Sequence, residues 1–218
     1  MKIVEIKPRR KSISGIIFDC EIDPKDYGAE SDPVGLLALD SELCELKGLK
    51  PGLALDDNLL QALVEESSIK RAKSRAMWCI SRQDMPKEKL RRKLLEHFPA
   101  YAAEAAVERA VELGFINDLE YAKRRLQLII NTRKVSLKSA ARLLLEEGVS
   151  RQDVEIASEE AEYDPLNAIL TLIERKYKLK LQAENGREKV MAALQRKGYS
   201  YGEIRTAFKA LEEDGNEF

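Results

Sequence analysis

The sequence predicts a mostly α-helical protein with three tandem three-helix repeats, preceded by a small N-terminal segment that contains strands. Apolar residues recur at helical spacing through most of the 218 residues, and one residue pattern returns at an offset of fifty positions. The residues before position 67 alternate in strand fashion instead. Because a chain of this length can bury one core or a few small units, stacked repeats are allowed.

The N-terminal segment, residues 1–66, is expected to hold two to four short strands and to end in a short helix. Apolar alternation at residues 3–6, 14–18 and 36–39 is separated by turn residues. Asp56 can cap a helix that continues toward residues 67–82. This segment carries 8 Lys and Arg against 14 Asp and Glu, whereas residues 67–218 carry 29 against 24. The excess of basic charge therefore lies in the repeats.

The repeats are predicted at residues 67–115, 116–162 and 163–218, the last with an acidic tail. In the second and third, a glycine ends one helix, and a serine with an acid three residues later starts the next. These residues are Gly148, Ser150 and Asp153 in one joint and Gly198, Ser200 and Glu203 in the other. The first repeat has His97-Phe98-Pro99 at this place, so its joint must be built differently.

Another helix precedes each pair, which gives three helices to a repeat. Apolar residues between positions 119 and 130 share one face after Asp118. Those between 166 and 177 do so after Asp164-Pro165, an N-capping acid followed by a proline at the first helical position. Because units of about fifty residues bury little surface alone, neighbouring repeats are expected to share contacts.

The stretch Gly114-Phe115-Ile116-Asn117-Asp118 is interpreted as the joint between the first two repeats. Gly114 suits the left-handed residue that closes a helix, and Asn117 suits the N-cap of the next helix. A calcium loop would need about five oxygen ligands over about twelve residues, and too few are present.

Residues that carry chemistry are scarce, and the sequence predicts neither an enzyme nor a metal or cofactor site. His97, the only histidine, is expected to be partly buried at a helix end, and no histidine triad or two-histidine metal site can form. The three cysteines, at positions 20, 44 and 79, are expected to be reduced and buried in a cytoplasmic protein. Trp78 and Phe115 are expected in the core. No stretch approaches the roughly 20 apolar residues that cross a membrane.

Positive charge on helices remains as the main functional signal. Residues 67–100 hold ten basic and three acidic side chains, and residues 119–144 hold seven and one. Such clusters can contact phosphates or acidic protein surfaces, although helices also carry them for solubility alone. Few aromatic residues lie among them, which argues against base stacking on single strands. Asn and Gln that could read base edges are scarce, which argues against sequence-specific duplex binding.

The residues around the first joint follow the order glycine, aromatic, aliphatic, Asx and then aromatic-alanine. They are Gly114, Phe115, Ile116, Asn117, Asp118, Tyr121 and Ala122, followed by an Arg-rich helix and Leu143-Leu144-Leu145-x-x-Gly148-Val149. This order resembles the RecX family of regulatory proteins, and the resemblance covers roughly residues 67–211. It implies tandem three-helix repeats that lie in the groove of the RecA nucleoprotein filament and regulate, usually inhibit, the recombinase in DNA repair and recombination.

The resemblance implies two partners, the RecA filament and, through weak and non-specific contacts, DNA phosphates. The expected contact residues are Lys123, Arg124, Arg125, Arg133, Lys134, Lys138, Arg142, Arg91 and Arg92. Reversing four of these charges together, at Arg124, Arg125, Arg133 and Lys134, is expected to weaken filament binding and leave the fold intact. Two alternatives remain: a DNA-binding regulator that acts without a recombinase, and a helical-repeat adaptor for an unrelated protein.

Overall fold

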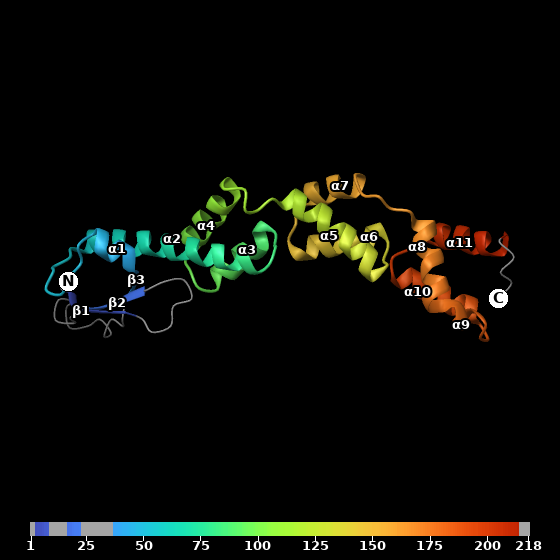
Figure 1. Cartoon of the computed structure of the whole chain (residues 1–218), viewed down its shortest axis with the longest axis horizontal. Coiled ribbons are helices and arrows are strands. Elements are labelled where there is room, and N and C mark those ends of the chain that lie inside the picture. The colour runs from blue at the N-terminus through green and yellow to red at the C-terminus, as the bar shows by residue number, and fades with distance from the viewer. Residues whose placement is uncertain (1–2, 9–16, 23–36, 214–218) are drawn as a thin grey trace. The chain divides into compact units, whose positions relative to one another are not determined.

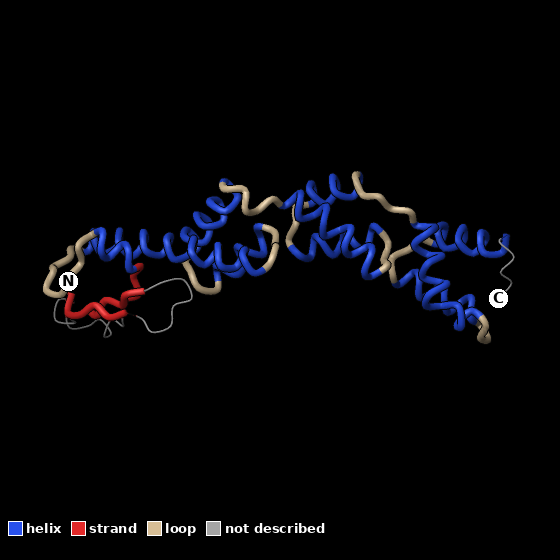
Figure 2. Tube along the Cα trace, viewed as in Figure 1, coloured by secondary structure: helices blue, strands red, loops and turns tan. Residues whose placement is uncertain are grey.

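The computed structural model describes residues 3–8, 17–22 and 37–213. The chain divides into two compact units, Met1–Ile116 and Asn117–Phe218. Helices joined by short loops make up most of both units, and strands occur near the start of the first (Figures 1 and 2). The predicted mostly α fold class with a small strand-containing start is confirmed.

The first unit begins with a three-stranded antiparallel sheet in the order β1-β2-β3. Its strands are β1 (Ile3–Pro8), β2 (Ile17–Ile22) and β3 (Leu37–Asp40). They fall at the three places where apolar alternation predicts strands, although positions 14–16 and 36 of those predictions lie outside the described residues. Helix α1 (Ser41–Leu46) follows, and the Asp40 carboxylate caps it by accepting a hydrogen bond from the Leu43 backbone N–H at 3.1 Å.

Helix α2 (Asp57–Arg82) runs without interruption through the domain boundary predicted at residue 66. The Asp56 carboxylate caps its start, accepting from the Leu59 N–H at 2.7 Å. Near this start, Leu63 packs with Ile3 and Leu43 in the core of the N-terminal segment, whereas further along Ala72 and its neighbours form the core of repeat 1. The N-terminal segment and repeat 1 therefore share one helix.

Repeat 1 comprises the second half of α2, α3 (Lys87–Leu95) and α4 (Ala100–Glu112). Its α3–α4 joint differs from the later joints as predicted, because Pro99 stands at the N-cap and makes no side-chain capping bond. Two buried positions were predicted wrongly: His97 is exposed, and Phe115 is 49% exposed. After Gly114 turns the chain with a φ of +71°, Ile116 takes the buried position in place of Phe115. Trp78 packs half-buried against this core.

Repeat 2 comprises α5 (Asp118–Arg133), α6 (Leu137–Glu147) and α7 (Arg151–Glu159) around a core that includes Leu126 and Leu144. The predicted caps are present. The side-chain oxygen of Asn117 accepts from the Glu120 N–H at 3.1 Å, and the Ser150 hydroxyl accepts from the Asp153 N–H at 3.1 Å after Gly148, whose φ is +97°.

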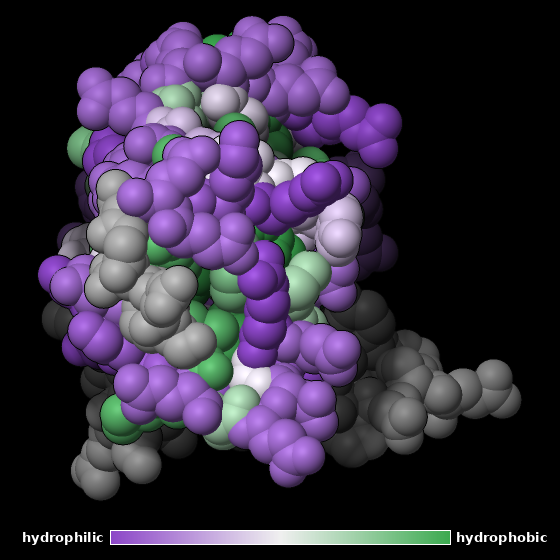
Figure 3. All heavy atoms as spheres, turned by 90° about the vertical axis from the view of Figure 1, so that its right-hand side faces the viewer, coloured by the Kyte–Doolittle hydropathy of each residue, from purple (hydrophilic) through white to green (hydrophobic). Residues whose placement is uncertain are grey.

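Repeat 3 starts with one helical run made of α8 (Pro165–Leu172), the π-helical segment η2 (Ile173–Tyr177) and α9 (Lys178–Leu181). Helices α10 (Gly186–Arg196) and α11 (Tyr201–Glu213) complete it. As predicted, Asp164 caps α8, and Ser200 and Glu203 exchange hydrogen bonds at the start of α11. Hydrophilic residues cover most of the face at this end of the chain, with a smaller hydrophobic area between them (Figure 3).

Candidate partner-binding surface

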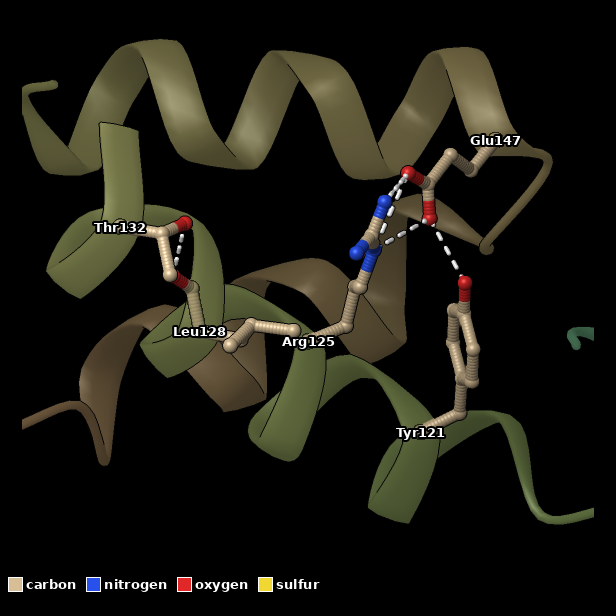
Figure 4. Close-up of polar contacts among 5 residues, drawn as sticks. All are labelled: Tyr121, Arg125, Leu128, Thr132 and Glu147. Carbon is tan, nitrogen blue, oxygen red and sulfur yellow. Dashed lines mark hydrogen bonds and ion pairs between the residues drawn. The ribbon is translucent and has the colours of Figure 1, made fainter. Parts of the chain in front are cut away.

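The basic residues predicted as contacts in repeat 2 fall into two groups, and the first group holds the repeat together. The Arg125 guanidinium of α5 binds both carboxylate oxygens of Glu147 on α6, with distances of 2.5 to 3.1 Å. The Tyr121 hydroxyl donates to the same carboxylate at 2.7 Å (Figure 4). Hydrogen bonding to Glu147 raises the pKa of Arg125 above its ordinary value. This arginine therefore joins two helices of its own repeat.

Lys123 belongs to the same structural group. Its Nζ lies 2.8 Å from a Glu160 carboxylate oxygen, just after α7, and 3.5 Å from Glu120 on its own helix. The hydrogen bond to Glu160 raises the pKa of the Lys123 amine. Because partners within the repeat occupy Lys123 and Arg125, they are weak candidates for contacting another molecule.

The expected fourfold charge reversal needs correcting for this reason. An acid at position 125 would face Glu147 across a contact in which only 32% and 22% of the two side chains are exposed. Repulsion between two partly buried carboxylates would destabilise the repeat, and weakened binding would then report unfolding. A useful variant leaves Arg125 in place.

The second group lies at the turn from α5 to α6 and beyond it. Arg133, the last residue of α5, and Lys138, in the first turn of α6, are exposed. Within the described residues, neither of them forms an ion pair. Lys134 closes α5 in the left-handed conformation, with a φ of +49°. Arg142 follows Lys138 by four residues, is 74% exposed, and has only a loose contact with Glu146 at 3.5 Å.

Arg124 is exposed on α5. The two residues predicted in repeat 1 each have an acidic partner. The Arg91 Nε donates to Glu104 of α4 at 2.5 Å, which raises the pKa of Arg91. The Arg92 Nε donates to Glu88 at 3.1 Å, although 61% of its side chain remains exposed. The structure therefore gathers Arg133, Lys134, Lys138 and Arg142 within repeat 2, and Arg91 and Arg92 within repeat 1.

The turn between α10 and α11 in repeat 3 lies against the α5–α6 turn. The Ser136 N–H donates to the Lys197 carbonyl at 3.0 Å, and the Lys197 Nζ donates to the Arg133 carbonyl at 2.5 Å. The Tyr199 hydroxyl donates to the Lys134 carbonyl at 3.3 Å. These contacts join the two repeats as expected for stacked units.

Lys197 adds a cation that the predicted contact set does not contain. Burial lowers the pKa of its amine, and the positive charge of Lys176 lowers it further. The sequence signal was present, because Arg175-Lys176 and Arg196-Lys197 recur in the basic pattern of the repeats. What the sequence could not indicate is that residue 197 meets residue 133, 64 positions away. We call Arg133, Lys134, Lys138, Arg142 and Lys197 the junction surface.

A groove of about 410 Å³ lies between α5 and the start of α8, beside this surface. Its polar lining has both signs, with Lys134 on one side and Glu162 and Asp164 on the other. Burial raises the pKa of the Tyr163 hydroxyl in this lining to about 12. Such a mixed lining does not assemble a nucleophile with a base, so the groove gives no support to a catalytic site.

Among the described residues, no His, Cys, Asp and Glu side chains form a group of three or more that could hold a metal ion. Cys44 and Cys79 are buried, as predicted, and the side chain of Cys20 lies outside the described part. No helix in the described residues combines the length and hydropathy needed to span a bilayer.

Comparison with known proteins points to one family. A family model described as "RecX, third three-helix domain" matches residues 162–208, which contain most of repeat 3. "Regulatory protein RecX" of Clostridioides difficile is 21% identical over 80% of this chain and 84% of its own length. "Regulatory protein RecX" of Clostridium acetobutylicum is 26% identical over 81% of this chain and 86% of its own.

Two solved structures share the fold. A crystal structure of regulatory protein RecX superposes with a TM-score of 0.64 at 19% identity, over 95% of this chain and 98% of the other. The crystal structure of RecX from Lactobacillus salivarius has a TM-score of 0.60 at 22% identity, over 66% of this chain and 97% of the other. The matched third domain and the two relatives confirm the resemblance to the RecX family of regulatory proteins that the sequence shows, and the two solved structures share the fold.

Proposed function

We propose that this chain is a non-enzymatic regulator that binds the RecA nucleoprotein filament and inhibits the recombinase in DNA repair and recombination. The names of its relatives support a regulatory role. The choice of RecA follows from the family resemblance, and the mode of binding follows from the junction surface. DNA phosphates serve as a second, weaker and non-specific contact.

The observation that carries the proposal is the pair of exposed cations Arg133 and Lys138, which form no ion pair within the described residues. Cations that have acidic partners in their own chain gain little from a second partner, because forming the new contact breaks the old one. Arg133 and Lys138 keep their charge available for carboxylates of a protein surface or for phosphates. Several such contacts along stacked repeats add up to useful affinity.

The test is a double charge reversal, Arg133→Glu with Lys138→Glu, assayed for inhibition of RecA-dependent ATP hydrolysis. Both side chains are exposed, so the fold should persist, and circular dichroism checks this. The matched control is Arg205→Glu with Lys209→Glu on α11, which changes the net charge equally at two exposed positions. We expect the first variant to inhibit about tenfold less than the wild type and the control to inhibit normally. Equal inhibition by both variants would remove the junction surface from the proposal.

A further inference from the structure

Two arginines flank Trp78, the only tryptophan of the chain, on α2 in repeat 1. The guanidinium carbons of Arg75 and Arg82 lie 4.1 Å and 4.8 Å from the centre of the Trp78 ring. Because these residues are spaced by three and four positions, they lie along one side of the helix. Trp78 packs half-buried against the core of repeat 1, so the ring holds both arginines on a rigid base.

The part of α2 that carries these arginines contains no acidic residue, and Asp84 follows Arg82 by two positions. Residues 67–82 contain five Lys and Arg and no Asp or Glu. Neither Arg75 nor Arg82 forms an ion pair with any residue that the structure describes. Other arginines of the same unit differ in this respect, since Arg91 is paired with Glu104 and Arg109 with Glu112. Two guanidiniums are thus held in place by an aromatic ring and keep their hydrogen-bonding capacity.

A guanidinium stacked over an aromatic ring suits one kind of ligand in particular. Stacking uses its flat face and leaves the N–H edge free to form paired hydrogen bonds with a phosphate. Since its position is already fixed, little side-chain entropy is lost on binding. Because the guanidinium carbons of Arg75 and Arg82 both lie within 4.8 Å of the centre of one ring, the two groups converge on one place. They can contact one phosphate or neighbouring phosphates of the same strand.

Base stacking is a less suitable use of the same residues. With two guanidinium groups over the Trp78 ring, little of the ring face remains for a nucleobase. The site therefore suits recognition of the backbone, which carries no sequence information. A structural role alone, in which the arginines merely cover the tryptophan, does not account for the absence of acidic residues in this stretch.

We propose that Arg75, Trp78 and Arg82 form a binding site for the phosphodiester backbone of DNA. The biological use of this site rests on the proposed function, since it lets repeat 1 contact the DNA of a RecA filament. Binding itself requires no recombinase, so it can be measured on DNA alone.

The experiment uses the full chain and a labelled single-stranded oligonucleotide of mixed sequence, without RecA, at several salt concentrations. Arg75→Gln with Arg82→Gln should bind roughly tenfold more weakly by fluorescence anisotropy, and the slope of log affinity against log salt should fall by about 1.4. The control, Lys47→Gln with Arg109→Gln, removes equal charge at positions that have acidic partners in the same unit, Glu66 and Glu112. It should bind nearly as the wild type does. If both double variants lose affinity equally, the proposal is overturned.

Trp78 supplies a second readout that needs no substitution. Because it is the only tryptophan, its emission, excited at wavelengths where bases do not absorb, reports on this site alone. We expect single-stranded and duplex oligonucleotides each to change the emission with the same midpoint as the anisotropy. Unchanged emission at saturation would place the DNA elsewhere and refute the site. The proposal is also refuted if poly-glutamate, at an equal concentration of negative charge, displaces the labelled oligonucleotide as well as unlabelled DNA does, because the site would then be a general anion surface.

These arms separate the two proposals. Failure of the Arg75–Arg82 site would appear with bare DNA and leave inhibition of RecA through the junction surface unaffected. Failure of the proposed function would appear as an absence of RecA inhibition while binding to bare DNA persists.

Discussion

Gly198 lies at the contact between repeats 2 and 3, and Gly198→Ala should destabilise the second unit by about 3 kcal/mol. The backbone there has a φ of +90°, a conformation that residues with a side chain rarely adopt. A Cβ atom at this position would collide with the Ser139 hydroxyl and lie 2.5 Å from the Ser136 hydroxyl. Since Ser136 is the N-cap of α6, moving it disturbs a second element.

The expected size comes from three local costs. A left-handed alanine costs about 1 kcal/mol relative to glycine. The Ser136 hydroxyl caps α6 by accepting a hydrogen bond from the Ser139 N–H at 3.2 Å. Breaking this hydrogen bond costs about 1 kcal/mol. Separating the turns weakens the hydrogen bond from the Ser136 N–H to the Lys197 carbonyl, which contributes about 1 kcal/mol.

Gly114→Ala is the matched control, because Gly114 is also left-handed, with a φ of +71°, but a Cβ there would meet nothing within 4 Å. It should cost only the backbone contribution, about 1 kcal/mol. Urea unfolding of the full chain, followed by circular dichroism, measures both variants. A second variant, Gly198→Ala with Ser139→Ala, removes the colliding hydroxyl and should recover part of the loss. If Gly198→Ala costs no more than Gly114→Ala, the tight contact between the two turns is refuted.

Two further predictions concern repeat 2 and its neighbour. Glu147→Gln should lower the free energy of unfolding by about 1–2 kcal/mol in the same urea experiment, because it weakens the paired hydrogen bonds to Arg125 in a contact that is only partly exposed. Arg142→Gln, at an exposed and loose ion pair, should change it by less than about 0.5 kcal/mol. Equal effects would contradict the distinction between structural and available arginines. Burial raises the Tyr163 pKa from 10.0 to about 12, so the folded state holds this proton more tightly than the unfolded state does. The stability that this proton contributes is complete below pH 10 and is lost as the pH rises toward 12. Thermal unfolding measured against pH should therefore show that Tyr163→Phe loses less stability than the wild type does between pH 10 and pH 12. An equal loss in the two proteins would contradict this.

The parts of the fold that could be predicted depend on local signals. Glycine followed by a capping Ser or Asn marks a joint within a few residues, so the joints at Gly114, Gly148 and Gly198 were identified correctly. The boundary at residue 66 had no such signal, because neither Gly nor Pro occurs between residues 53 and 85. Helix α2 continues through it for that reason.

The candidate site was less predictable because it depends on distant residues. Which arginine is structural and which is available follows from where acidic side chains fold, as Arg125 and Glu147 show across 22 positions. Phe115 was assigned to the core by hydrophobicity, yet the chain direction after Gly114 gives the buried position to Ile116. Trp78 could be placed against the core from its type, but its two stacked arginines could not.

The most direct test of the whole account is a titration of the chain against RecA filaments, bare single-stranded DNA and bare duplex at two salt concentrations. We expect tighter binding to the filament than to either bare DNA, and we expect Arg133→Glu with Lys138→Glu to remove most of this difference. Binding to bare DNA as tight as to the filament, with no response to RecA, would contradict it.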